Sequence, residues 1–124
     1  MKRIVTVATL ALFCIGGAAS AQGGGAAAFI QGRQAGMMLS GASMAAIKGA
    51  IDAQQAPATQ RFNTRGLARW AHAVPGMFPA GSGEEAGVPT NAKAEVWTDR
   101  AGFEAKAAAY AAAADRLAEL AQGE

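Results

Sequence analysis

The sequence predicts an all-α protein, an antiparallel helical bundle, and three observations support this fold class. Large apolar residues recur every seven positions in separate stretches of the chain. Alanine, the best helix former, is the commonest residue in all of these stretches. The alternating pattern of β-branched residues and the Asn-Gly turns that mark strands and hairpins are missing. With 124 residues, the chain suits one domain.

Residues 1–21 have the features of a signal peptide. Two basic residues precede an apolar run over residues 4–15, and small residues at 19 and 21 fit cleavage after Ala21. The apolar run is too short for a stable membrane span, so we expect no membrane attachment once the leader is removed. The single cysteine, Cys14, lies within the leader. We therefore expect residues 22–124 to form the mature, exported domain in the periplasm.

The charge balance of the predicted mature chain excludes one class of partner. The full sequence has 11 Lys and Arg and nine Asp and Glu, and the leader holds two of the basic residues. Nine bases against nine acids leave a net charge of zero with His neutral. A nucleic-acid-binding domain would be strongly basic, so we expect no nucleic-acid partner.

The first helix is predicted over residues 29–53, after a flexible start at 22–28. Its inward stripe repeats every seven residues and has one further member at position 47: Ile30, Met37, Met44, Ile51 and Ile47. Four glycines interrupt the stretch, each costing up to about 1 kcal/mol relative to Ala. We interpret them as points where another helix approaches closely: Gly32, Gly36, Gly41 and Gly49.

The second helix is predicted over residues 58–74, and Pro75 and Gly76 end it because proline disfavours helical backbone in the residue before it. Its predicted inward residues are Phe62, Gly66, Leu67, Trp70 and Val74. Residues 75–96 form a long loop rich in proline and glycine, and such loops in compact domains are often functional.

The third helix is predicted over residues 99–121. Thr98 and Asp99 are both good N-cap types, and Gly123 marks the end. The predicted inward stripe again has a period of seven, with flanking apolar positions: Phe103, Tyr110, Leu117, Ala107, Ala114 and Leu120.

The residues give little support to an enzyme. No nucleophile elbow, zinc-protease motif, phosphate loop or dinucleotide fingerprint is present. The only histidine, His72, sits near the end of the second helix, where it suits the helix dipole. Imidazole also binds haem iron, so a ligand role for His72 stays open as a second interpretation.

Three segments together resemble the cytochrome c prime family, the four-helix c-type cytochromes of the bacterial periplasm. They are the Arg33-Gln34-x-x-Met37 run, the MFPAGSG run at 77–83 and the AKAEVWTD run at 92–99. The resemblance implies that our three helices are three of the four in that bundle. It also implies haem c as cofactor, iron-based electron transfer or binding of small gases, and an electron-transfer partner.

The resemblance also suggests residues for the haem site. Arg33 and Gln34 would meet the haem carboxylates, and Met37 would cover the open face of the iron. Thr90 and Asn91 would approach the haem edge, and Trp97 would pack beside the start of the third helix. Relatives often form dimers through their first two helices, so a homodimer is possible.

The departure from the family concerns haem attachment. The family uses a CxxCH motif on a fourth helix, whose two cysteines bind haem and whose histidine binds iron. The sequence has no such motif and reaches Glu124 about where that helix would begin. We therefore expect a truncated member that cannot attach haem c covalently, with an open apolar groove beside Met37, Met44 and Phe103.

Two alternatives follow from that open groove. The first is a haem-free helical module of the periplasm that binds a partner helix in the groove. The second is non-covalent haem binding through Met37 or His72, which requires both side chains to face one cavity.

Overall fold

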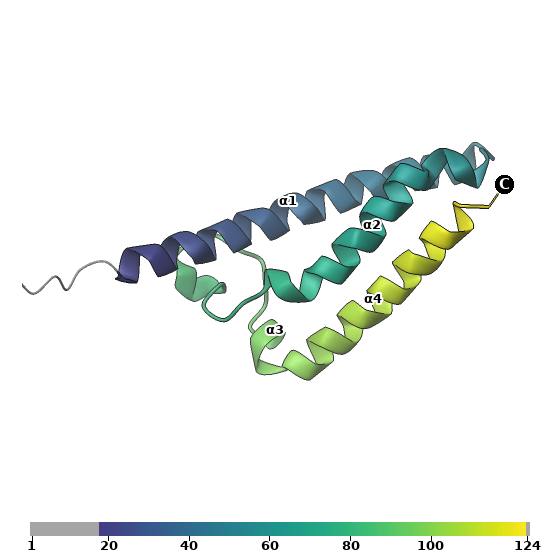
Figure 1. The fold of residues 1–124 in the computed structure, drawn as a ribbon. Helices are drawn as coiled ribbons and strands as arrows, with labels where there is room; N and C mark the ends of the chain where they lie inside the picture. The colour runs from purple at the N-terminus through teal and green to yellow at the C-terminus, as the bar shows by residue number, and fades with distance from the viewer. Residues whose placement is uncertain (1–17, 124) are drawn as a thin grey trace, which may run out of the picture.

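The fold consists mainly of three long helices, which confirms the all-α prediction (Figure 1). The computed structural model describes residues 18–123. The long helices are α1 (Ala18–Asp52), α2 (Arg61–Ala73) and α4 (Arg100–Leu120), and α3 (Glu95–Thr98) is a single turn. Helix α2 lies between α1 and α4 and runs antiparallel to both, which confirms the predicted arrangement. In the described range, no helix is long and apolar enough to cross a membrane.

Helix α1 begins well before its predicted start. The flexible segment expected at 22–28 is wrong, because the helix already includes these residues. Alanines on both sides of three consecutive glycines carry the helix through them, since adding a residue to an existing helix is much easier than nucleating one. Most of the predicted signal peptide, including Cys14, lies outside the described residues.

Glycine sets the contact between α1 and α2 at one point. A Cβ added at Gly36 would collide with the ring of Trp70, and one at Gly32 would lie 3.0 Å from the Met77 side chain. The predicted close approach is therefore confirmed at these two positions. It is wrong at Gly41 and Gly49, where an added Cβ would meet nothing within 4 Å.

Alanine sets the contact between α2 and α4. The buried cluster between these helices is made of five alanines with Tyr110 packed at its edge: Ala68, Ala71, Ala111, Ala114 and Ala118. Small side chains let the two backbones approach closely, so this seam needs no large residues. Leu67 and Val74 are buried as predicted, and Trp70 is half-buried.

Two large residues predicted to point inward are exposed. Phe62 is 88% exposed, because the alanine seam and Leu67 fix the buried face of α2 and Phe62 lies on the opposite side of the helix. Leu120 is 62% exposed, because the buried residues in the last turns of α4 are Ala118 and Ala121. Gly66 is also exposed.

Both ends of the second helix differ from the prediction. A 3-10 turn, η1 (Pro57–Gln60), occupies its predicted start, and at its end a second such turn, η2 (Val74–Met77), continues the helical backbone through Pro75 and Gly76, which were predicted to end it. A third such turn, η3 (Glu84–Ala86), follows in the loop. Asp99 caps α4 as predicted, because its side chain accepts a hydrogen bond of 3.0 Å from the Gly102 backbone N–H.

Helices α1 and α4 separate toward the end that carries the loop (Figure 1). We call the space between them the trough: Met37 and Ile51 belong to its α1 wall, and Phe103 and Leu120 to its α4 wall. The predicted stripe of α1 is only partly buried, since Ile30 and Ile47 are covered while Met37, Met44 and Ile51 are exposed. An open groove is thus present beside Met37 and Phe103, as the sequence predicts, whereas Met44 lines neither of its pockets.

Candidate functional site

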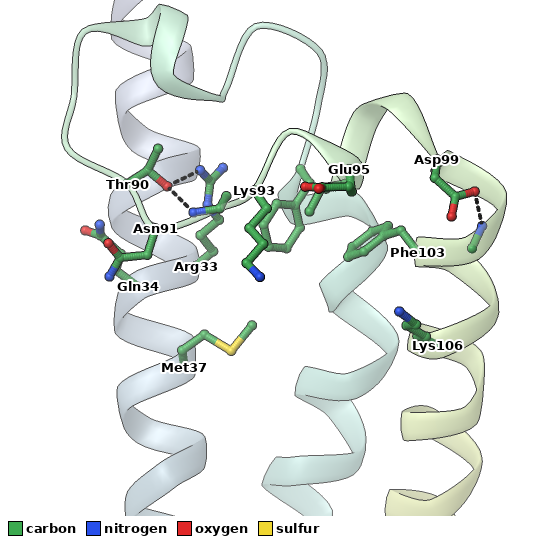
Figure 2. A pocket seen from close by; sticks show the side chains of 14 residues that line it. Arg33, Gln34, Met37, Thr90, Asn91, Lys93, Glu95, Asp99, Phe103 and Lys106 are labelled. Carbon is green, nitrogen blue, oxygen red and sulfur yellow. Dashed lines mark hydrogen bonds between the residues drawn. The ribbon is translucent and has the colours of Figure 1, made fainter.

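The wide end of the trough contains a pocket of about 590 Å³ (Figure 2). This volume is within the range of about 300–1,000 Å³ typical of small-molecule sites. Helix α1, the loop before α3, α3 itself and the start of α4 all contribute side chains. The lining residues that matter below are Arg33, Gln34, Met37, Phe78, Phe103 and Lys106.

Arg33 connects α1 to the loop. Its guanidinium donates hydrogen bonds to Ser82 Oγ (3.0 Å), the Ser82 carbonyl (2.7 Å) and Thr90 Oγ1 (2.8 Å). The side chain is nearly inaccessible, at 3% exposure. Gln34 adds a second connection, since its amide donates to the Pro89 carbonyl at 3.0 Å. These bonds hold the loop over the end of the pocket.

The charge of Arg33 is buried and forms no ion pair with a carboxylate of the described residues. Burial lowers the pKa of Arg33, and the charge of Glu85 opposes this shift without forming an ion pair. Within residues 24–123, the partners of the guanidinium are neutral oxygens and the faces of Phe78 and Trp97, at 4.7 and 5.9 Å from the ring centres. A ligand carboxylate near Arg33 would therefore be stabilised by a cation that forms no ion pair within the described residues.

The remaining walls combine apolar surface with charge at the rim. Figure 2 shows Met37 reaching from α1 toward the middle of the trough, with Phe103 and Lys106 on α4 opposite. Lys93 extends from the loop toward the same space. The lining also includes two carboxylates, Glu95 and Asp99, beside the three cations Arg33, Lys93 and Lys106. The arrangement suits a flat, largely apolar ligand whose negative groups lie near the cations.

Five of the six predicted site residues line this one pocket: Arg33, Gln34, Met37, Thr90 and Asn91. Trp97 does not line it. Its indole N–H donates to the Pro79 carbonyl at 3.0 Å, and its ring packs edge-on against Phe78, with the ring centres 6.2 Å apart. Trp97 thus supports the wall behind Phe78.

The sequence analysis did not assign several of the lining residues to the site, and three of these recur below: Phe78, Lys93 and Lys106. Only Lys106 had a usable signal, because it follows Phe103 by three positions and so lies on the same face of α4. Phe78 and Lys93 are in or beside the loop, where periodicity does not indicate direction.

His72 belongs to a different part of the surface. Its Nε2 lies 2.9 Å from the nearer carboxylate oxygen of Asp115, and this exposed pair links α2 to α4. It is not among the residues that line the pocket. In the part of the chain that the structure describes, no three His, Cys, Asp or Glu residues are grouped as a metal site.

Comparison with known proteins adds one finding. A family model described as cytochrome C′ matches residues 28–124. No curated protein and no solved structure matches the chain. The matched range covers all three long helices except the start of α1, and it includes the whole pocket. The chain therefore belongs to the cytochrome c′ family.

Proposed function

We propose that this protein is a haem protein of the periplasm, for electron transfer or the binding of small gases as in its haem c family, and that these residues hold the haem without covalent attachment. The trough between α1 and α4 would receive the haem, with Met37 over its open face. This is a binding role rather than a catalytic one. Family membership supports the class of cofactor, and the pocket supports its position.

The residues of this chain fit one part of the cofactor and not another. Met37, Phe78 and Phe103 offer apolar surface to a flat macrocycle, and Arg33, Lys93 and Lys106 offer positive charge to its carboxylates. The 124 residues contain no CxxCH motif, so they supply neither the two thioether bonds nor the axial imidazole. Non-covalent ligation by Met37 and His72 together is not favoured, because His72 lies outside the pocket lining.

Each lining residue would then have a distinct task. Arg33 and Gln34 would hold the carboxylates at the loop end, where Arg33 is already fixed by Ser82 and Thr90. Met37 and Phe103 would exclude water from the open face. Bound haem supplies an iron that can exchange an electron or bind a diatomic gas.

One observation carries the proposal: Arg33 is a buried cation at the edge of an apolar pocket and has no ion pair within the described residues. Burying a charge is costly unless a partner compensates it. A ligand that combines an apolar plane with edge carboxylates supplies both the missing counter-charge and the missing apolar contact.

Haemin titration of the purified protein tests the proposal, with two adjacent methionines as a matched pair. Met37 lines the pocket and is 48% exposed, whereas Met38 is 76% exposed and is not among the lining residues. We expect saturable one-to-one binding with a shifted Soret band. Met37→Asp should weaken it at least about tenfold, because a carboxylate would be desolvated against the macrocycle. Met38→Asp should leave it unchanged.

Two results would count against this function. Absence of a saturable spectral change would mean that the pocket does not accept haem without covalent attachment. Equal effects of the two substitutions would mean that haemin binds to apolar surface in general rather than in the pocket.

A second function is favoured by the exposure of the trough beyond the pocket. Ile51 and Leu120 are exposed at its narrow end, where another cavity of about 200 Å³ lies between α1 and α4. We propose as the alternative a haem-free module that binds a partner helix along the trough. Under this function Ile51→Asp would weaken binding of an amphipathic helical peptide while haemin has no effect.

A further inference from the structure

The first residue of α4, Arg100, is placed against two local preferences of helices. A cation in the first turn of a helix opposes the helix dipole, which favours acidic residues there. Arg100 also pairs with Glu104, four positions later, and this order stabilises a helix less than the reverse order with the acid first. Contacts outside its own helix explain why an arginine occupies this position.

The guanidinium of Arg100 binds the end of the helical segment that continues α2. Its Nη2 donates a hydrogen bond to the Pro75 carbonyl at 2.9 Å, and its Nη1 donates to the Phe78 carbonyl at 3.1 Å. Pro75 belongs to η2 and Phe78 follows η2 directly, so both are carbonyls of a helix end, where intrahelical partners are lacking. The Nε donates to Glu104 Oε1 at 2.8 Å. One side chain thus joins the start of α4 to the end of η2.

The backbone that Arg100 holds carries the aromatic wall of the pocket. The rings of Phe78 and Phe103 meet edge-on with their centres 5.1 Å apart, and both residues line the pocket. The guanidinium carbon of Arg100 lies 5.1 Å from the centre of the Phe103 ring. Arg100 itself is not among the lining residues. It therefore contacts the backbone of one wall residue and the ring of the other without contacting the pocket space.

Trp97 holds the neighbouring peptide group. Its indole N–H donates to the Pro79 carbonyl, and its ring packs against Phe78. The carbonyls of two consecutive residues, Phe78 and Pro79, are thus bound by Arg100 and Trp97 respectively. Because the two carbonyls are adjacent in the chain, release of the first should loosen the second. The environment of Trp97 can therefore report on the contacts of Arg100.

From this geometry we infer that Arg100 is a positioning residue for the pocket, which fixes Phe78 and Phe103 in the arrangement that receives a flat ligand. The inference rests on the proposed function only for the identity of that ligand. A site whose walls are fixed before binding loses less conformational freedom when the ligand enters, so it binds more tightly. Arg100 raises the affinity of the pocket and sets the orientation of the ligand without touching it.

Arg61 provides a matched control at the opposite end of the fold (Figure 1). Its guanidinium also donates to two backbone carbonyls just beyond a helix end, those of Ala121 at 3.2 Å and Gln122 at 3.3 Å. Arg61 is not among the residues that line the pocket. Arg61→Met and Arg100→Met therefore remove the same kind of contact, in one case far from the pocket and in the other beside its aromatic wall.

The fluorescence of Trp97 tests the inference without haem. The chain has two tryptophans, so Trp70→Phe leaves Trp97 as the single emitter. In this background we expect Arg100→Met to shift the emission to longer wavelength, because the indole becomes more exposed to water. Arg61→Met should leave the emission unchanged, and far-UV circular dichroism checks that each variant keeps its helix content. Unchanged emission in Arg100→Met would overturn the inference whether or not haem binds.

Haemin titration tests the effect on the ligand. Arg100→Met should weaken binding about fivefold and change the circular dichroism of the Soret band, which depends on the aromatic rings beside the haem. Arg61→Met should keep the original affinity and spectrum. Arg100→Lys retains the charge but not the planar fork of donors, so it should resemble Arg100→Met. Full recovery by lysine would mean that only charge matters, and equal losses in Arg61→Met and Arg100→Met would mean that only general stability matters; either result would overturn the inference.

The two measurements separate failure of this inference from failure of the proposed function. If the unmodified protein gives no saturable Soret change, the proposed function is wrong, and the emission of Trp97 still decides whether Arg100 fixes the wall. If the unmodified protein and Arg100→Met bind haemin with the same affinity and the same Soret dichroism, Arg100 does not position the site although haem binding stands.

Discussion

At the scale of single residues, Arg33 joins folding to the proposed function. It bonds to residues 49 and 57 positions later in the chain, and it lines the pocket at the same time. The sequence identified Arg33 only through its resemblance to a family motif. Only the structure reveals that Arg33 holds the loop, because no local sequence pattern indicates its contact with Ser82.

Arg33→Met tests this role by keeping an unbranched, flexible side chain while removing the donors. The buried Ser82 carbonyl would lose its 2.7 Å hydrogen bond from Arg33, and hydrogen bonds to charged groups contribute about 1.5–3 kcal/mol each. The substitution also removes the cost of burying a charged group, the same burial that lowers the pKa of Arg33, and this part of the change favours the folded state. We expect a net loss of about 1–3 kcal/mol in the free energy of unfolding.

Urea denaturation measures this loss, and limited proteolysis should show faster cleavage in the loop over residues 78–90. Arg116→Met is the control, since Arg116 is exposed on α4 and surface changes usually stay within about 0.5 kcal/mol. Identical midpoints for the two variants would show that Arg33 does not hold the loop.

At the scale of elements, side-chain size at a few contact points determines how closely the helices approach. Gly36 lets α1 approach the Trp70 ring on α2, and alanines let α2 approach α4. The first contact places a glycine against the Trp70 ring, and the second is made by alanines with Tyr110 at the edge. Helix spacing therefore depends on which small residues face a neighbour.

Two glycines of the same helix provide a matched test. Gly36→Ala should destabilise the fold by about 1–3 kcal/mol, because the added methyl group overlaps Trp70 and overpacking has that cost. Gly41→Ala should stabilise it by up to about 1 kcal/mol, because its Cβ meets open space and alanine favours helix. Thermal and urea denaturation with circular dichroism measure both. Two changes of the same sign would contradict the assigned contact.

The helices could be predicted from the sequence because heptad spacing and the Asp99 cap are local signals, whereas Pro75 does not end the helical backbone, which continues as η2. The direction of Phe62 could not be predicted, because a stripe of large residues was assumed to point inward while small residues form the real seam. The same limit applies to Gly41 and Gly49, since a glycine does not reveal which side has a neighbour. In the site, five residues were found through resemblance, while Lys93 had no signal at all.

At the scale of the whole molecule, the described helices bury one side of a bundle and leave the other open. Met44 and Ile51 on α1 and Leu120 on α4 are exposed apolar residues. Burying such a side chain fully contributes about 1.5–3 kcal/mol, whereas a whole domain has only about 5–15 kcal/mol of net stability. Filling the trough with haem or a helix should therefore change stability greatly.

We expect the purified protein to unfold with weak cooperativity when its trough is empty. Its van't Hoff enthalpy should fall well below the roughly 60–80 kcal/mol usual for a domain of about 100 residues, because few large side chains are packed together. Circular dichroism melts and calorimetry measure this enthalpy. A ligand that binds only the folded state must raise the transition temperature. Haemin should therefore raise and sharpen the melt of the protein and of Met38→Asp, and at the same haemin concentration it should raise that of Met37→Asp less. A sharp, high-temperature transition of the ligand-free monomer would mean that the three helices form a complete core by themselves.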